Sequence, residues 1–407
     1  MNKKKILFFT GFVGGRGSSK TIFWLYQGLK ESGYQPIIAS ESLYMYKLND
    51  LNLRPNLVIQ RKPAESDQAI YLKCEKILSQ ISFDYLISFS PRTYGSYYAF
   101  RKGIPYAICE YSTPLSFEKF PSRYIGEVYQ KANSYIILTP FPLKYSKVKE
   151  MSNIAVCAQP YPQRQLKTVK EIRKMSIKKA RQKLFPYYPE IKNLQYDLLV
   201  FLNINDEYVN PFNICPNNRN YQDEYGRSQN GFLSSKGQGQ TLSFITRLIA
   251  GLETNFKGKS LVYMLEGVQK MAQPVLDQCQ KVRAFSRPSP FVDLEIDLLL
   301  KKAADINICR ASLCDNSAEL YLIAKPFVTS IVPTGFMNED QGLEQAQKLG
   351  TCFPIAYDDP FYISKLIEFS QDKKKQKKIA QKMVQITKLM LEKFNCYATI
   401  VDSIERS

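Results

Sequence analysis

The sequence predicts an α/β protein of two domains, each organised around a parallel β-sheet. Its 407 residues are enough for two domains of ordinary size, and 44% of them are hydrophobic, as in folded globular proteins. Each half contains short apolar strands followed by a glycine-containing turn and then a helix. Between Ala303 and Gly350 the pattern runs strand, loop, helix, strand, loop, helix, which is typical of parallel sheets with helical crossovers.

The chain is strongly basic. Lys and Arg total 56 against 37 Asp and Glu, a formal net charge of +19, which favours an anionic partner. The candidates are nucleic acid, an anionic membrane surface and a phosphorylated substrate, and the alternative is a solvated surface that serves solubility alone. No zinc-finger or RNP motif is present and the lysines are scattered along the sequence, so we expect no nucleic-acid partner. The run Lys373–Lys378 is most simply interpreted as the solvated face of a C-terminal helix pair.

Cysteine and histidine usage limits the chemistry and the compartment. Nine cysteines, at no spacing typical of a disulfide framework or a zinc site, indicate reduced thiols in a cytoplasmic protein. Histidine is absent, which removes the commonest general base and the commonest metal ligand, and we predict neither a metal site nor a cofactor. The first apolar run is cut short by Gly11, so we expect no signal peptide. No run approaches the roughly 20 apolar residues that span a bilayer, so any membrane contact is expected to be peripheral, on the inner face.

The N-terminal segment predicts a first βαβ unit. A strand over 6–10 runs into a glycine-rich turn over 11–19, and a helix over about 20–32 follows, ended by Gly33. The turn has neither the Walker spacing nor the dinucleotide fingerprint. Its candidate ligand-binding residues are Gly14, Gly15 and Arg16: the glycines allow a ligand to approach the backbone, and the guanidinium can clamp a phosphate. The alternative is a purely structural turn.

The remainder of the first half predicts further strands over 36–39, 85–89, 106–109 and 134–138. Glu110, at the end of one of them, is the nearest carboxylate able to take a proton from a hydroxyl, although a surface glutamate without a role is an equal alternative. Aromatic and basic residues mingle over 117–149, a composition that suits anionic lipid headgroups or an ordinary half-buried helix pair.

The second half begins after a proline-containing linker over 159–168 and a basic helix over about 169–184. We therefore expect domains over 1–160 and 186–382, joined by 161–185, with a final helix over 383–407. Strands are predicted over 198–202 and 260–265, and 203–230 reads as a long loop. A glycine-containing segment with Lys236, Gly237 and Gly239 precedes a helix over 241–252.

The segment from Ala303 to Gly350 contains the strongest ligand-binding pattern. A strand over 306–309 ends in a polar turn that begins at Arg310, and Asn316 and Glu319 are spaced as a capping box. A buried strand over 326–332 follows, and then a polar helix that starts near Asp340 and Gln341. Helix N-termini at the carboxyl edge of such a sheet suit a diphosphate. Asp358 and Asp359 are interpreted as N-terminal charges of a later helix and not as a metal site.

These motifs resemble the donor-sugar half of GT-B glycosyltransferases. The closest branch contains the N-acetylglucosaminyltransferase of peptidoglycan lipid assembly and the diacylglycerol glycosyltransferases, with a family 28-like C-terminal domain. The residues that carry the resemblance are Ala304, Asp305, Arg310, Glu319, Val332, Pro333, Asp340, Gln341 and Ala346. The resemblance implies that Glu319 holds the nucleotide ribose and that Asp340 and Gln341 hold the sugar hydroxyls.

The resemblance also implies an architecture, two Rossmann-like domains facing a cleft, with the last helix crossing back to the first domain. Lys236, Gly237 and Gly239 would form the second glycine loop, against the diphosphate, and Phe291 and Val292 would close over the uracil ring. Two histidine positions of the family are occupied here by Arg16 and Cys109.

Three functions fit these observations. The first is an inverting, metal-independent transfer of a hexose or N-acetylhexosamine from a UDP-sugar to a hydroxyl acceptor, expected to be a membrane lipid or a lipid-linked sugar. The second is a binding or partner subunit of the same fold without transfer activity, which the replaced histidines favour. The third is a UDP-sugar 2-epimerase, which the absence of histidine disfavours. The oligomeric state stays open.

Overall fold

The computed structural model describes residues 4–10, 15–41, 53–60, 65, 67–89, 94–110, 123–138, 152–157, 160–161, 163–203, 235–286, 293–309, 315–331, 346–356, 358–392 and 395–407. These residues form two compact units. The first comprises the described residues up to Gln163 together with Met390–Ser407, and the second comprises the described residues from Arg164 to Leu389.

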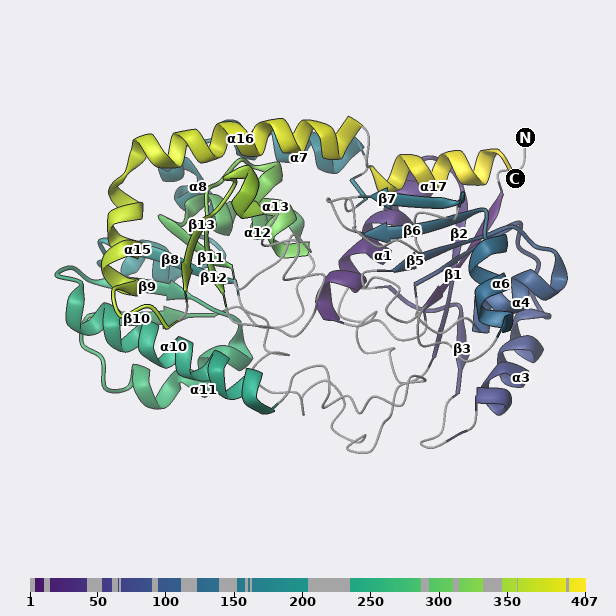
Figure 1. Cartoon of the computed structure of the whole chain (residues 1–407), viewed down its shortest axis with the longest axis horizontal. Helices are drawn as coiled ribbons and strands as arrows, with labels where there is room; N and C mark the ends of the chain where they lie inside the picture. Colours follow the sequence, from purple (N-terminus) through teal and green to yellow (C-terminus); the bar gives the residue numbers. More distant parts are fainter. Residues whose placement is uncertain are drawn as a thin grey trace. The chain divides into compact units, whose positions relative to one another are not determined.

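The first unit is a parallel sheet of seven strands, in the order β3-β2-β1-β4-β5-β6-β7 (Figure 1). Its strands are β1 (Lys5–Thr10), β2 (Gln35–Glu41), β3 (Leu57–Ile59), β4 (Tyr85–Ser88), β5 (Tyr106–Glu110), β6 (Ser134–Leu138) and β7 (Ile154–Cys157). Its helices are α1 (Gly15–Glu31), α3 (Asp67–Leu78), α4 (Tyr94–Lys102), α6 (Arg123–Lys131) and α17 (Cys396–Glu405).

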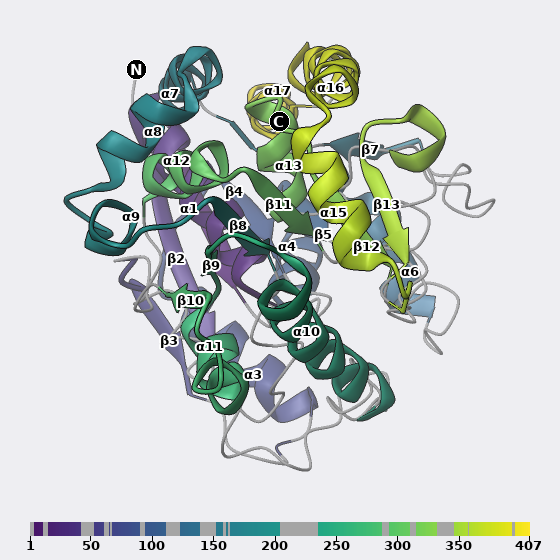
Figure 2. The same ribbon diagram turned by 90° about the vertical axis from the view of Figure 1, so that its left-hand side faces the viewer.

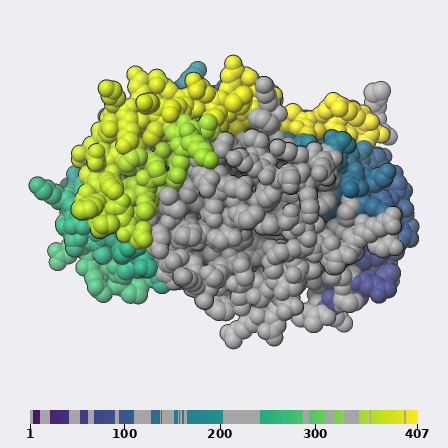
Figure 3. Space-filling view, in the orientation of Figure 1, coloured from purple at the N-terminus to yellow at the C-terminus, as the bar shows by residue number. Residues whose placement is uncertain are grey.

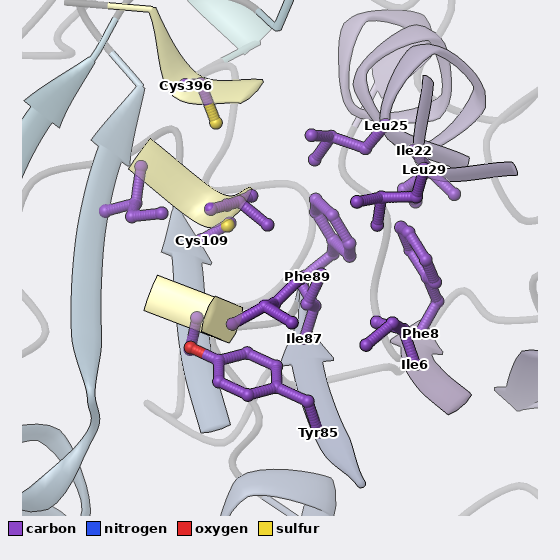
Figure 4. Close-up of a cluster of buried hydrophobic side chains, with 14 of the residues drawn as sticks. Ile6, Phe8, Ile22, Leu25, Leu29, Tyr85, Ile87, Phe89, Cys109 and Cys396 are labelled. Carbon is purple, nitrogen blue, oxygen red and sulfur yellow. The ribbon is translucent and has the colours of Figure 1, made fainter. Parts of the chain in front are cut away.

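Helices cover both faces of this sheet, which explains why its central strands are continuous apolar runs. On β1, Ile6 and Phe8 pack with α1 and α17 on one face, whereas Leu7 and Phe9 pack with α3, α4 and α6 on the other. Side chains alternate between the two faces of a strand, so burying both faces requires an apolar residue at every position. Figure 4 shows the first of these clusters, with Ile6, Phe8 and Ile87 below the side chains of α1.

The last helix, α17, belongs to the first unit. Tyr85 on β4 and Ser403 on α17 share a hydrogen bond of 2.6 Å, and the Tyr397 hydroxyl donates to the Gly28 carbonyl of α1 at 2.9 Å. Lys4 Nζ donates to the Ile404 carbonyl at 2.6 Å. The chain therefore leaves the first unit after β7 and returns to it at its C-terminal end.

The second unit is a parallel sheet of six strands, in the order β10-β9-β8-β11-β12-β13. Its strands are β8 (Leu198–Asn203), β9 (Ser260–Tyr263), β10 (Val282–Phe285), β11 (Ile306–Cys309), β12 (Val328–Ile331) and β13 (Phe353–Ala356). Its helices are α7 (Gln163–Lys174), α8 (Ile177–Leu184), α9 (Pro189–Asn193), α10 (Ser235–Asn255), α11 (Glu266–Leu276), α12 (Leu294–Ala303), α13 (Asp315–Leu322), α15 (Tyr362–Gln371) and α16 (Lys373–Glu392). Helices α10 and α11 lie on one side of this sheet, and α8, α12 and α13 lie on the other (Figures 1 and 2).

The structure corrects several predicted boundaries. The basic helix expected over 169–184 is two helices, because Ser176 caps a new one: its side chain accepts a hydrogen bond from Lys179 N at 3.2 Å. Much of the expected linker is the start of α7, which begins at Gln163, directly after the second proline. The capping box is wrong as well, because α13 begins at Asp315 and Asn316 therefore lies inside it.

None of the helices in the described ranges combines the length and the hydropathy that a membrane-crossing segment requires.

Candidate functional site

The strand order of the second sheet reverses between β8 and β11. Strands β9 and β10 lie on one side of this pair and β12 and β13 on the other, and the last residues of the pair, Asn203 and Cys309, are in register. In open parallel sheets such a reversal leaves a crevice at the carboxyl ends of the strands, and ligands bind there. The helices that follow these two strands are α10 and α13, so both begin at this edge of the sheet.

Helix α10 carries the predicted second glycine segment in its first turns. It begins at Ser235, so Lys236, Gly237 and Gly239 lie inside the helix and not in a loop before it, as the sequence had indicated. The first backbone N–H groups of a helix have no partner within the helix, and the helix dipole adds partial positive charge there. The described backbone of these residues is therefore suited to bind an anion, and their side chains lie outside the described part.

Helix α13 carries Glu319, the residue that the resemblance assigns to the ribose. Its side chain is fully buried, and its carboxylate accepts a hydrogen bond from the ε-amine of Lys301, on the last turn of α12. The same amine donates to Asp297 Oδ2 at 2.7 Å, one helical turn earlier on α12. It also lies 5.7 Å from the centre of the Phe201 ring on β8. One buried lysine thus faces two carboxylates and one aromatic ring.

The contacts of this cluster join α12, α13 and β11, the last of which is one of the two strands at the strand-order reversal. Asn307, in the middle of β11, donates through Nδ2 to the Lys301 carbonyl at 3.0 Å and fastens α12 to the sheet. Asn307 Oδ1 is buried and has no hydrogen-bond partner in the described part of the chain. Burying a charge costs several kcal/mol unless opposite charges and hydrogen bonds surround it, so Lys301, Asp297 and Glu319 depend on one another.

The buried position of Glu319 bears on its predicted role. In this structure the carboxylate faces the interior of the second unit and not an open surface. Ribose binding by Glu319 therefore stays a prediction, and the structure adds a second role, which is to neutralise Lys301. Sequence reasoning missed Lys301, Asp297 and Asn307. The spacing of four residues between Asp297 and Lys301, within a largely apolar helix, was the signal that could have indicated a buried ion pair.

The first sheet has the same reversal, between β1 and β4. Helix α1 follows β1 and begins at Gly15, so Gly15 and Arg16 form its first turn and not a preceding loop. Helix α4 follows β4 and packs closely on β1: a Cβ added to Gly95 would lie 2.4 Å from Cγ of Phe9. Of Arg16 only the backbone is described.

The predicted base, Glu110, is the last residue of β5, the strand next to β4. This places it at the carboxyl edge of the first sheet, close to the reversal, and its side chain lies outside the described residues. Its neighbour Cys109 is 2% exposed and packs in the core with Cys396 of α17 (Figure 4). Burial, together with the contact with Cys109, raises the pKa of the Cys396 thiol. Cys109 therefore belongs to the core, although it occupies the position of a histidine in the resembled family.

The remaining predicted residues, Gly14, Phe291, Val292, Arg310, Asp340 and Gln341, lie outside the described part of the chain.

Asp359 has the role that the sequence predicted. Its Oδ1 accepts from the Phe361 backbone N–H at 2.8 Å, just before α15, and its Oδ2 accepts from Lys365. The hydrogen bond from Lys365 and that from the backbone lower the pKa of Asp359. Within the described residues, no group of three or more His, Cys, Asp or Glu side chains is placed to hold a metal ion.

Comparison with known proteins identifies the fold. No family model and no curated protein matches the sequence. Solved structures do match over nearly the whole chain. MurG of Acinetobacter baumannii is 12% identical with a TM-score of 0.56, over 99% of this chain and 100% of MurG. A glycosyltransferase from Rickettsia africae ESF-5 is 14% identical with a TM-score of 0.60, over 100% and 98%.

A third similar structure is a UDP-GlcNAc 2-epimerase from Neisseria meningitidis, bound to UDP-GlcNAc. It is 13% identical with a TM-score of 0.59, over 99% of this chain and 100% of the epimerase. Likenesses at such low identity establish the fold and not the activity. The chain therefore has the α/β fold of two Rossmann-like domains that GT-B glycosyltransferases and UDP-sugar 2-epimerases share.

Proposed function

We propose that this chain is a glycosyltransferase that moves a hexose or N-acetylhexosamine from a UDP-sugar to a hydroxyl acceptor. The observation that carries the proposal is the strand-order reversal of the second sheet, with α10 and α13 beginning at its carboxyl edge. A nucleotide diphosphate is the kind of ligand that such an edge binds. Similarity to a glycosyltransferase and to an epimerase bound to UDP-GlcNAc supports the choice of donor.

In this proposal the donor lies on the second unit. The diphosphate sits at the start of α10, where backbone N–H groups and the charge of Lys236 offset its negative charge. Arg310 is a second cation for the diphosphate, and Phe291 and Val292 cover the uracil ring. Glu319 binds the ribose hydroxyls. Asp340 and Gln341 bind the sugar.

The chemical step is a direct displacement at the anomeric carbon. The acceptor hydroxyl oxygen forms the new bond, the bond to the diphosphate breaks, and UDP leaves, which inverts the configuration of that carbon. Helix N-termini and basic side chains stabilise the negative charge that develops on the leaving diphosphate, without a metal ion. We assign the acceptor proton to Glu110, the carboxylate at the carboxyl edge of the first sheet.

The acceptor in this proposal is a membrane lipid or a lipid-linked sugar. The support for this step is the net charge of +19, which favours approach to an anionic surface.

The first test is calorimetric titration of the whole chain with UDP, UDP-GlcNAc, UDP-glucose and, as a control, ADP. The proposal requires uridine nucleotides to bind and ADP to bind at least tenfold more weakly. Incubation with radiolabelled UDP-sugars and lipid extracts should then transfer label to a lipid fraction. Binding without any preference for uridine would contradict the assignment of the donor.

The second candidate is a partner subunit of the same fold that binds a nucleotide sugar without transferring it. The buried position of Cys109, in place of a family histidine, favours this candidate. It predicts tight UDP-sugar binding with no transfer, no hydrolysis and no change of the sugar. Appearance of the 2-epimer, followed by proton NMR of the sugar, would instead indicate an epimerase.

A further inference from the structure

Helix α16 begins with a concentration of lysines that does not stabilise the helix. It runs from Lys373 to Glu392 with the sequence KKKQKKIAQKMVQITKLMLE, and five of its first six residues are lysines. The N-terminal end of a helix has partial positive charge, so lysines there destabilise the helix and acidic residues stabilise it. The first turn of α16 holds no acidic residue. Asp372, just before it, accepts from the Lys375 backbone N–H at 2.8 Å and is a single cap beside this run.

Packing explains some of these lysines and not others. Lys373 Nζ donates to the Ser370 carbonyl at 2.6 Å and so caps the end of α15. Lys375 Nζ lies 4.0 Å from the centre of the Phe353 ring. In contrast, Lys374, Lys377 and Lys378 are exposed, and in the described part of the chain no hydrogen bond or ion pair of their side chains holds them. These three lysines therefore serve no contact of the fold that the structure describes.

The exposed lysines lie on one face of α16, together with two exposed apolar side chains. At 100° per residue, Lys374, Lys377 and Lys378 share a face with Val384 and Leu389, which are 40% and 42% exposed. The opposite face, formed by Ile379, Met383 and Thr387, is buried.

A second row of lysines extends the positive charge beyond α16. Lys167, Lys170 and Lys174 are exposed on α7. Figures 1 and 2 place α7 on the same edge of the second unit as α16. In the space-filling view, α16 forms the outer surface along this edge (Figure 3). Exposed lysines therefore lie on two helices, α7 and α16, at this edge of the second unit.

We propose that this exposed face of α16 (Lys374, Lys377, Lys378, Val384 and Leu389) docks on an anionic phospholipid membrane. Lysines near an anionic leaflet are attracted by its surface potential. Exposed Val and Leu side chains are stabilised when their apolar surface is buried in the membrane interface. Single-stranded nucleic acid is the poorer partner. Proteins that bind it offer aromatic rings on which the bases stack, and α16 has no aromatic residue. The inference rests on the lipid-acceptor part of the proposed function, since it names the surface through which the chain would reach a lipid.

The test is co-sedimentation of the full chain with vesicles, without nucleotide. The probes are vesicles of phosphatidylcholine alone and of phosphatidylcholine mixed with phosphatidylglycerol. We expect binding to the mixed vesicles only, weakening as salt is raised. The variant K374Q/K377Q/K378Q should lose at least tenfold in partition coefficient, because each lysine near such a surface is worth about a fivefold factor.

A charge-matched control separates this face from total charge. The variant K30Q/K76Q/K102Q removes three exposed lysines from the last turns of α1, α3 and α4, in the first unit. It should bind vesicles within about twofold of the wild type. Thermal unfolding should show both variants folded, and the α16 variant at least as stable as the wild type, because it removes cations from a helix N-terminus.

Three results would overturn the inference: no binding of the wild type to anionic vesicles, equal losses in the two triple variants, or binding of a DNA oligonucleotide through the α16 lysines in place of vesicles. Replacing Val384 and Leu389 by Ser should weaken the vesicle binding that persists at high salt. An unchanged affinity at high salt would show that these two side chains do not contribute to binding. Uridine-nucleotide binding is measured separately. A lack of uridine-nucleotide binding would contradict the proposed function and leave the docking result intact. A lack of vesicle binding would contradict the docking inference and leave the assignment of the donor intact.

Discussion

Lys301 on α12 donates a hydrogen bond to the carboxylate of Glu319 on α13, and both side chains are fully buried. The two residues are 18 positions apart in the sequence, and the contact spans the strand between their helices. Asp297 contacts the same amine, so replacing Lys301 and replacing Glu319 should change the stability of the fold by different amounts.

The first prediction concerns the order of these stability costs. Lys301→Met removes the buried amine that both carboxylates contact and should lower the free energy of unfolding by about 3–5 kcal/mol. Glu319→Gln leaves Lys301 paired with Asp297 and keeps a hydrogen-bonding side chain, so it should cost about 1–2 kcal/mol. Urea denaturation measures both, and the double variant should cost less than the sum. If Glu319→Gln were the costlier change, the cluster would not centre on Lys301.

The second prediction separates a structural role of Glu319 from a role in ribose binding. If Glu319 binds the ribose hydroxyls, Glu319→Gln should weaken UDP binding by about 1.5–3 kcal/mol, the range for hydrogen bonds to charged groups. The affinity for 2′,3′-dideoxyuridine diphosphate should then be unchanged, since that nucleotide lacks the hydroxyls. Calorimetry with both nucleotides makes the comparison. Equal losses for the two nucleotides would indicate that Glu319 acts only through the fold.

The third prediction is a pH dependence that arises from Lys325. This lysine lies between α13 and β12 and is 8% exposed, and burial lowers its pKa to about 7. Its pKa in the unfolded chain is about 10.4, so between these values the unfolded state binds one proton more. Stability should therefore rise with pH from about 7 towards 10, with a slope of up to about 1.4 kcal/mol per pH unit.

The variant Lys325→Met tests this prediction by subtraction. It should be more stable than the wild type at pH 7, with the difference shrinking as pH rises, because the variant has no proton to release. Urea denaturation at several pH values between 7 and 9 measures the difference. A difference that does not change with pH would show that Lys325 titrates normally in the folded protein.

The fourth prediction tests the close packing of α4 on β1. Gly95→Ala should lower the free energy of unfolding by about 1–3 kcal/mol, because the new Cβ meets Cγ, Cδ1 and Cδ2 of the Phe9 ring and not a flexible chain end. Phe9→Leu removes the flat ring, so Gly95→Ala should lower the free energy of unfolding by less in that background. Chemical denaturation of the four proteins gives the coupling energy. A coupling near zero would mean that the helix shifts instead of pressing on the ring.

Strand positions were largely predictable, and the exceptions share a place at the edge of a sheet. Strands β1, β4, β5, β6, β8 and β11 follow the predicted runs to within a residue or two. The strands β3, β7 and β13, which were not predicted, all lie at an edge of a sheet. An edge strand has a neighbour on one side only and can leave more of its side chains exposed, as in β13, where only Ile355 is buried.

The candidate site was less predictable because it depends on which helices meet. The glycines and Lys236 were expected in a loop, but they lie within α10, since nothing local marks where a helix begins when no cap is recognised. Glu319 was selected from the family resemblance, and its burial against Lys301 could not be read from that resemblance.

The sequence by itself determined the alternation of strands and helices and the excess of positive charge, because periodicity and composition are local properties of the chain. Only the tertiary structure decided that Glu319 and Lys301 are buried together and that the lysines of α16 and α7 lie on one edge of the second unit. Those outcomes depend on the order in which the strands pair, which places residues far apart in the sequence side by side and leaves others facing solvent.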